Sequence, residues 1–324
     1  MSEHDEFSII DQLFKPLAGL CREARGLMDD VAVIPGDAEH DLLVSTDALV
    51  AGVHFFENDP LDLVARKLMR VNISDIIAKG GTPYGYQLVT AWPRGTPIND
   101  KRDFVRGLKA DQDRFGLSLF GGDTVSTPGP LTLVMTIFGK APRGRALSRV
   151  GAKPGDRIFV SGYIGQGHLG LRALQGALSG LSQGDRNALI SAYHLPEIRP
   201  DLASAVLNHA SSAMDISDGL LADADHMARA NGLMMRLDLD RVPTSLAARA
   251  AIAQGCSVID LVTGGDDYQI LCTAADAGAD ALLMAGFYEI GVCLGLSQDA
   301  LPGAELWAGE RRVDAPVKGF RHPV

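Results

Sequence analysis

The sequence predicts a protein of the α/β (α+β) class with two domains. Its 324 residues set a prior of about two domains. Hydrophobic residues make up 46% and charged residues 22% of the chain, which also contains 36 glycines, as expected for a compact protein of this class. Short apolar segments alternate with helical patterns, and glycine-rich turns join them. We place the domain boundary in the linker-like stretch "VGAKPGD", so the domains span residues 1–150 and 151–324.

The first half is expected to begin with a helix at 7–18 and a strand at 42–50. A second helix covers about 60–79 and ends at Lys-Gly-Gly. Strands at 116–120 and 131–141 follow, with the turn-like sequence "GGDT" between them. One face of the second helix is marked by three-four spacing, at Leu61, Val64, Leu68, Val71, Asp75 and Ala78.

Asp75 continues the apolar stripe of this helix instead of its polar side. A carboxylate buried there costs roughly several kcal/mol, or becomes protonated, unless a partner compensates its charge. Asp75 is therefore a candidate functional residue.

The second half is expected to open with a strand at 157–165. A helix lies within 217–232 and ends at Asn-Gly, and Ser217 and Asp218 are candidates for its N-terminal cap. The segment 264–274, "GGDDYQILCTA", is a turn that leads into a strand, and 304–313 is a terminal hairpin.

Charge and cysteine content limit the classes of function. The formal charge of −10 argues against nucleic acid as a partner and against a basic membrane-binding face. An anionic substrate would need an added attraction, for which a divalent cation is the natural source. The 4 cysteines show no C-x-x-C spacing, which favours reduced thiols over disulfides or zinc. No signal peptide or membrane-length apolar run is visible, so we expect a cytoplasmic protein.

Two pairs of short acidic motifs recur at one interval. "NISD" begins at Asn72 and "GGDT" at Gly121, while "DISD" begins at Asp215 and "GGDD" at Gly264, which is 49 residues in both cases. Chance and a duplicated binding element both explain so short a pattern. Either way, both halves are expected to contribute acids to one site.

The stretch "GQGHLG", residues 165–170, matches the glycine pattern G-x-G-x-x-G of dinucleotide-binding proteins. Such a unit also carries an acid about 20 residues further on, at the end of a second strand. No strand pattern precedes Asp185 here. A glycine-rich turn from strand to helix is the favoured interpretation.

Several aspartates directly follow apolar runs, where ligands bind in α/β sheets. Each one alone is explained as a turn, cap or surface residue. Together they repel one another unless protons or cations relieve the repulsion. Carboxylates, hydroxyls and water are ligands that Mg²⁺ accepts, often together with substrate phosphates, so metal-assisted phosphoryl transfer is indicated. The candidates are Asp29, Asp30, Asp47, Asp75, Asp123, Asp215, Asp218, Asp266 and Asp267.

Seven motifs in order resemble the thiamine-monophosphate kinase family, of the aminoimidazole ribonucleotide synthetase and selenophosphate synthetase superfamily. They are "GLMDDVAV", "VSTDALVAGVHF", "VNISDIIAKGGTP", "GGDT", "GRALSRVGAKPGD", "DISDGL" and "GGDDYQIL", within about residues 6–320. The resemblance implies a two-domain aminoimidazole ribonucleotide synthetase-like fold with mixed sheets covered by helices. It also implies ATP-dependent phosphorylation of thiamine monophosphate to thiamine diphosphate, several Mg²⁺ ions, and a homodimer whose N-terminal domains form a shared sheet or barrel.

The resemblance also implies roles for individual residues. The metal ligands would be Asp30, Ser45, Thr46, Asp47, Asp75, Asp123, Asp215 and Asp218. The ATP contacts would be Gly122, Asp123, Arg149 and Ser217, and the thiamine contacts His54, Asp266 and Phe320. No general base is required, because a phosphate monoester with a second pKa near about 6 is already largely dianionic at neutral pH. We expect direct in-line transfer through positioning and charge neutralisation around Asp47, Asp75 and Asp123.

Three positions depart from the family pattern. Met28 stands where glycine is usual, Asp266 replaces a glutamate, and the tail "GFRHPV" lacks a terminal His-Phe pair. These departures concern substrate affinity more than fold. Cys21 is followed by Arg22 instead of glycine, which counts against a selenophosphate synthetase, and the Pro-Val end counts against the hydrogenase-maturation relatives. An aminoimidazole ribonucleotide synthetase-like enzyme and a non-catalytic nucleotide sensor remain alternatives.

Overall fold

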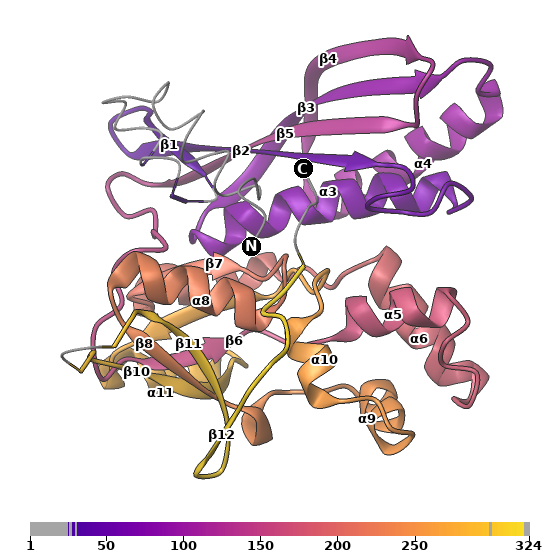
Figure 1. The fold of residues 1–324 in the computed structure, drawn as a ribbon. Helices are drawn as coiled ribbons and strands as arrows, with labels where there is room; N and C mark the ends of the chain where they lie inside the picture. Colours follow the sequence, from indigo (N-terminus) through magenta and orange to yellow (C-terminus); the bar gives the residue numbers. More distant parts are fainter. Residues whose placement is uncertain (1–24, 26–27, 30, 298–299, 321–324) are drawn as a thin grey trace.

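The computed structural model describes residues 25, 28–29, 31–297 and 300–320 and shows two β-sheets with helix α3 between them (Figure 1). Both sheets contain parallel and antiparallel pairs, which confirms the expected α/β (α+β) class with mixed sheets. The predicted helix at 7–18, Cys21 and Asp30 lie outside the described residues.

The first sheet has five strands in the order β1-β2-β5-β3-β4. Only the β3–β4 pair is parallel among these neighbours. The predicted strands at 42–50 and 131–141 are confirmed as β2 and β5. The bounds are β1 Ala32–Pro35, β2 His40–Val50, β3 Thr82–Pro93, β4 Ser118–Thr127 and β5 Thr132–Pro142.

The "GGDT" sequence lies inside strand β4, so its assignment to a turn was wrong. Gly121 and Gly122 have φ values of 149° and 151°, in a region that favours glycine. A Cβ on Gly122 would lie 1.8 Å from the carbonyl oxygen of Leu88 on β3. The glycine pair therefore lets two backbones approach closely within a sheet instead of ending a strand.

Helix α3, Leu61–Ala78, confirms the predicted helix at 60–79, but the expectation of a single buried face was wrong. Every residue from Lys67 to Ala78 is buried, polar ones included. The helix packs against β2 and β5 on one side and β7 and β9 on the other, so it has no solvent face there. The helix α4, Ile98–Phe115, lies beside it and ends at Gly116.

The second sheet has seven strands in the order β12-β11-β8-β10-β6-β9-β7, of which only β11–β8 is a parallel pair among the described residues. The predicted strands in 157–165 and 264–274 are confirmed as β6 and β9, and the terminal hairpin as β11–β12. The bounds are β6 Arg157–Val160, β7 Ser212–Asp215, β8 Met234–Asp238, β9 Ile270–Ala274, β10 Tyr288–Leu294, β11 Gly303–Ala308 and β12 Arg311–Val313.

The helix predicted within 217–232 is confirmed as α8, Leu220–Asn231, which ends at Gly232. Its N-terminal cap is Gly219, with no side-chain hydrogen bond, so a capping role for Ser217 or Asp218 was wrong. The other helices are α5 Gln166–Leu174, α6 Gln183–His194, α7 Ala203–His209, α9 Leu246–Ala253, α10 Val258–Thr263, α11 Asp276–Met284, and the short 3₁₀ helices η3 Pro200–Leu202 and η4 Leu239–Arg241.

Apolar packing continues across the proposed domain boundary at residue 150. The largest core cluster joins Leu43 and Ile76 in the first half to Phe159 and Cys272 in the second. The division into 1–150 and 151–324 therefore stays a prediction.

Cys256, Cys272 and Cys293 are free thiols, as expected. None of the helices in the described part of the chain is long and apolar enough to cross a membrane.

Candidate functional site

A cleft of about 1010 Å³ is lined by residues from both halves of the chain. Its walls come from β2 and α3 on one side, and from the ends of β7 and α8, the loop before β9 and the C-terminal tail on the other. The predicted site residues that line it are Ser45, Thr46, Asp47, His54, Asp75, Arg149, Asp215, Ser217, Asp218, Asp266 and Phe320.

Gly122 and Asp123 do not line this cleft. Both lie on β4, the exposed edge strand of the five-stranded sheet. Asp29, the described member of the Asp-Asp pair, is buried between Arg25 at 2.6 Å and Lys79 at 2.7 Å. Asp29 is therefore part of a buried ion-pair network, and the predicted ligand Asp30 lies outside the described residues.

Strand β2 and helix α3 bring the first acids together. Alternation along the strand places Ser45 and Asp47 on the same face. The Ser45 hydroxyl donates to Oδ2 of Asp75 at 2.6 Å, which gives this buried carboxylate a hydrogen-bond partner but, being neutral, does not compensate its charge. The Thr46 hydroxyl lies 2.9 Å from the Thr136 hydroxyl on β5, so the side chain of Thr46 points to the neighbouring strand.

The "NISD" and "DISD" motifs have different structures, so they are not one duplicated element. The first lies within helix α3, and the second begins at the end of strand β7. They nevertheless meet, because the Ser74 hydroxyl donates to Oδ2 of Asp215 at 2.6 Å. Asp215 is buried, so this hydrogen bond fixes the second acid against the helix that carries Asp75.

The loop before β9 is paired with the segment that follows β7. The Asp266 amide donates to the Ser217 carbonyl at 2.9 Å, and the Tyr268 amide donates to the Ile216 carbonyl at 2.7 Å. A Cβ on Gly265 would lie 2.4 Å from the Ser217 carbonyl oxygen, so glycine permits this approach. Asp266 and Tyr268 have φ values of 73° and 52°, a left-handed conformation that is uncommon outside glycine.

The C-terminal tail closes one side of the cleft. The Phe320 amide donates to the Asp218 carbonyl at 2.9 Å, next to the start of α8. A Cβ on Gly319 would lie 2.4 Å from the Cβ of Ala222, so the tail runs close to this helix. The Phe320 side chain is 49% exposed and contributes an aromatic ring to the cleft wall.

Arg149 enters the cleft from a linker that Asn231 holds. The Asn231 side chain accepts hydrogen bonds from the amides of Gly151 and Ala152, and it donates to the Arg149 carbonyl at 2.9 Å. These bonds fix the backbone from which the Arg149 side chain extends, and its planar guanidinium is suited to bidentate binding of phosphate. His54 is fixed by its own turn, because its Nδ1 accepts from the Val50 amide at 3.0 Å. In the neutral ring the proton therefore lies on Nε2.

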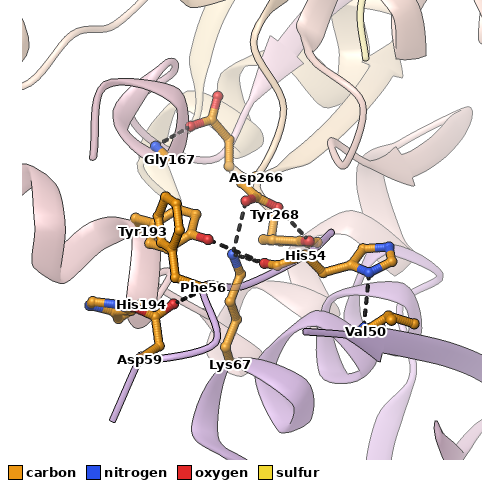
Figure 2. A network of polar contacts seen from close by, with 11 residues as sticks. Val50, His54, Phe56, Asp59, Lys67, Gly167, Tyr193, His194, Asp266 and Tyr268 are labelled. Atoms are coloured by element: carbon orange, nitrogen blue, oxygen red, sulfur yellow. Dashed lines mark hydrogen bonds and ion pairs between the residues drawn. The ribbon is translucent and has the colours of Figure 1, made fainter. Parts of the chain in front are cut away.

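A buried lysine behind the cleft was missed in the sequence analysis. Lys67 donates from Nζ to Oδ2 of Asp266 at 2.8 Å, and its Nζ lies 3.7 Å from the ring centroid of Tyr193. Figure 2 shows these side chains close to Tyr268 and to the main chain of His54, whose imidazole points away toward Val50. A signal was present, because Lys67 lies on the same helical stripe as Val64 and Asp75. A lysine on an apolar stripe needs a buried partner as much as an aspartate does.

The "GQGHLG" segment is the predicted glycine-rich turn into a helix, with Gly165 as the N-cap of α5. Its amides hold a second buried acid, since Gly165 and Gly167 donate to Asp267 at 2.7 and 3.3 Å. His168, whose pKa is lowered by burial, adds an imidazole to the cleft wall. The motif therefore contributes to the site without forming a dinucleotide-binding unit.

Burial raises the pKa of Asp267 from 3.8 to about 7, against the lowering effect of the Gly165 and Gly167 amides. The folded state then holds this proton between about pH 4 and 7, where the unfolded chain has lost it, so the contribution of Asp267 to stability falls as pH rises. We expect Asp267→Asn to flatten the pH dependence of the unfolding free energy by up to about 1.4 kcal/mol per pH unit in that window. Urea unfolding at a series of pH values measures it. The exposed Asp113→Asn is the control, and an unchanged slope in Asp267→Asn contradicts the prediction.

The cleft is strongly acidic. Among the described residues, two arginines and seven aspartates line it, the aspartates being Asp47, Asp75, Asp215, Asp218, Asp223, Asp260 and Asp266. Within the same part of the chain, no three His, Cys, Asp or Glu side chains are close enough to form a metal site by themselves. Mg²⁺ in proteins is commonly held by one or two carboxylates together with water and substrate phosphates. The oxygen donors of the described residues fit that mode of binding.

Comparison with known families identifies both halves of the chain. Residues 28–141 match the model of the AIR synthase related protein, N-terminal domain, and residues 153–285 match that of the C-terminal domain.

Known proteins align with most or all of the chain. The thiamine-monophosphate kinase of Caulobacter vibrioides is 46% identical over 271 residues, which cover 82% of this chain and 76% of that protein. The thiamine-monophosphate kinase of Salmonella typhimurium is 34% identical, with 98% of both chains covered. A solved structure described as "AaThiL complexed with AMPPCP and TMP" superposes with a TM-score of 0.87 at 27% identity, covering 99% of this chain and 98% of that one.

Proposed function

Because the chain belongs to the thiamine-monophosphate kinase family, with both AIR synthase related domains, we propose that it transfers the γ-phosphate of ATP to thiamine monophosphate. One structural observation supports the proposal independently of family membership. Residues from β2, α3, β7 and the loop before β9 meet in a single acidic cleft. Such a cleft repels two phosphorylated substrates unless cations compensate its charge, which is the problem that a phosphate-to-phosphate transfer has to solve.

The acids of the cleft are proposed to hold Mg²⁺ together with the substrate phosphates. Asp47, Asp75, Asp215 and Asp218 supply the carboxylates. Bound Mg²⁺ supplies charge neutralisation between the γ-phosphate and the acceptor phosphate. The Ser45 and Ser74 hydroxyls orient Asp75 and Asp215 through their 2.6 Å hydrogen bonds. Two of the acids are thus fixed before any substrate binds, which lowers the entropic cost of assembling the site.

The remaining lining residues are proposed to bind the two substrates. Arg149 and Ser217 contact the phosphates of ATP. His54, Asp266 and Phe320 surround the thiamine group, with Phe320 offering an aromatic face to its rings. The acceptor phosphate attacks directly, because it is already ionised at neutral pH, and no side chain has to remove a proton. The transfer therefore depends on in-line positioning by the cleft.

We propose a homodimer that forms through the first sheet. Strand β4 is an exposed sheet edge, and Leu119, Phe120 and Val125 on it are 53%, 51% and 46% exposed. An exposed apolar edge strand of this kind can pair with a strand of another chain. Gly122 and Asp123 lie on the same strand, so their assignment to ATP is compatible with a site that is completed near the dimer contact. The cytoplasm remains the expected location.

Incubation of the purified chain with ATP, Mg²⁺ and thiamine monophosphate tests the proposal, with chromatography as the readout. We expect thiamine diphosphate and ADP to form in equal amounts. When EDTA removes the metal, neither product should form. Unphosphorylated thiamine serves as the control acceptor and should give no product, because it lacks the acceptor phosphate. A folded chain that binds ATP but forms no thiamine diphosphate contradicts the proposal and favours a nucleotide sensor.

A further inference from the structure

Lys67 lies directly behind the cleft wall and contacts three of the residues that form it. Its side chain is only 2% exposed and does not itself line the cleft. Nζ donates to Oδ2 of Asp266 at 2.8 Å and to the His54 carbonyl at 3.4 Å, and it lies over the ring of Tyr193. Tyr268 completes the group by donating to Oδ1 of the same Asp266 carboxylate at 2.8 Å (Figure 2).

The Asp266 carboxylate is consequently held on both oxygens. Each oxygen takes one donor, Lys67 on Oδ2 and Tyr268 on Oδ1, and keeps capacity for another hydrogen bond. The Asp266 side chain is 30% exposed and faces the cleft, whereas its lysine partner is buried. The backbone of Asp266 has a φ of 73°, a conformation that an isolated aspartate adopts only at some cost. Contacts from α3, 199 residues away in sequence, therefore determine where this carboxylate points.

We infer that Lys67 is a positioning residue for the acceptor substrate: it orients Asp266 so that the carboxylate accepts a hydrogen bond from an amino group of the thiamine heterocycle. Lys67 acts through Asp266 and does not touch the substrate. The inference deepens the proposed function and rests on it. It also connects α3, which carries the metal-binding Asp75, to the loop that binds the acceptor.

The test compares Lys67→Met with Lys109→Met. Methionine keeps the length and apolar stem of lysine but removes the ammonium group, and Asp266 can then be hydrated because it is partly exposed. We expect Lys67→Met to raise the KM for thiamine monophosphate about tenfold, with kcat and the KM for ATP changed by less than about twofold. Lys109 forms an exposed ion pair with Asp113 on α4, so Lys109→Met should leave all three constants unchanged.

A double-substitution cycle separates positioning from a general structural role. In an Asp266→Asn background, Lys67→Met should change the KM for thiamine monophosphate by less than about twofold, because its target is already altered. Three results overturn the inference: an unchanged KM in Lys67→Met, the same tenfold increase in both backgrounds, or a parallel loss of both substrate affinities with a lowered Tm.

Failure of the proposed function gives a different result. If the wild-type chain makes no thiamine diphosphate, calorimetric titration of thiamine monophosphate into wild type and Lys67→Met replaces the kinetic comparison. Equal Kd values in the two proteins overturn the positioning role, and a weaker Kd in Lys67→Met supports it. A wild-type chain that neither turns over nor binds thiamine monophosphate overturns both proposals.

Discussion

Asp47→Asn is expected to lower turnover by at least about a thousandfold, equivalent to about 4 kcal/mol of lost transition-state stabilisation. Asp47 lines the cleft from the face of β2 that carries Ser45, on the same wall as Asp75 of α3 and across from Asp215 of β7. Asparagine has nearly the same shape but no charge, so it weakens cation binding without removing packed atoms. The measurement is the rate of thiamine diphosphate formation at saturating ATP and Mg²⁺.

The folded state should tolerate this substitution. The cleft contains seven aspartates, so removing one negative charge relieves repulsion, and the Tm in EDTA should stay equal or rise slightly. Asp113→Asn, which removes a charge from the exposed end of α4, should change neither turnover nor Tm. Turnover near the wild-type level in Asp47→Asn would remove Asp47 from the proposed metal ligands.

Gly122→Ala is expected to destabilise the protein by about 4 kcal/mol or more, whereas Gly121→Ala costs only about 1–3 kcal/mol. The two glycines are adjacent and have nearly equal φ values of 149° and 151°, so the backbone strain of an alanine is similar at both. The two positions differ in the space available for a side chain. A Cβ on Gly122 would overlap the Leu88 carbonyl oxygen at 1.8 Å, whereas a Cβ on Gly121 would meet nothing within 4 Å. The difference between the two variants therefore measures steric contact alone.

Urea denaturation of the two variants measures this difference in the free energy of unfolding. Light scattering of the native variants measures their molar mass, which reports whether β4 supports the proposed dimer. Gly184→Ala is the control, since this glycine lies in helix α6 with its nearest foreign atom at 3.8 Å. We expect it to stabilise the protein by about 0.5–1 kcal/mol. Equal losses in Gly121→Ala and Gly122→Ala would mean that β3 and β4 are not packed as closely as described.

Much of the fold follows from patterns that lie within single elements. Strand β2 was predicted from an apolar run, helix α3 from apolar periodicity, both α3 and α8 from the glycines that end them, and the hairpin β11–β12 from its short sequence pattern. The "GGDT" segment was assigned wrongly, because adjacent glycines usually mark a turn and only the neighbouring strand β3 explains them here. Strand β3 itself, an inner strand of the first sheet, was not predicted, although it pairs with both β4 and β5.

The candidate site, like the fold, could be predicted from the sequence only in part. The anomalous place of Asp75 on an apolar stripe was visible in the sequence, and its partner Ser45 was among the predicted residues. The contact between Ser74 and Asp215 was not predictable, because the two residues are 141 positions apart. Lys67 shows both cases: its place on the stripe could have been noticed, while its ion pair with Asp266 depends on how the two sheets pack around α3.

The sequence by itself determined the class of fold, the order of the motifs and the acidic, oxygen-rich character of the site. These properties are local, since periodicity and composition report how each segment partitions between core and solvent. Only the tertiary structure decided that α3 is buried on all sides, that β4 is an exposed edge carrying Asp123, and that Lys67 meets Asp266. Contacts between distant segments depend on strand order and on the packing of layers. They are determined by the free energy of folding of the whole chain, which no single segment reports.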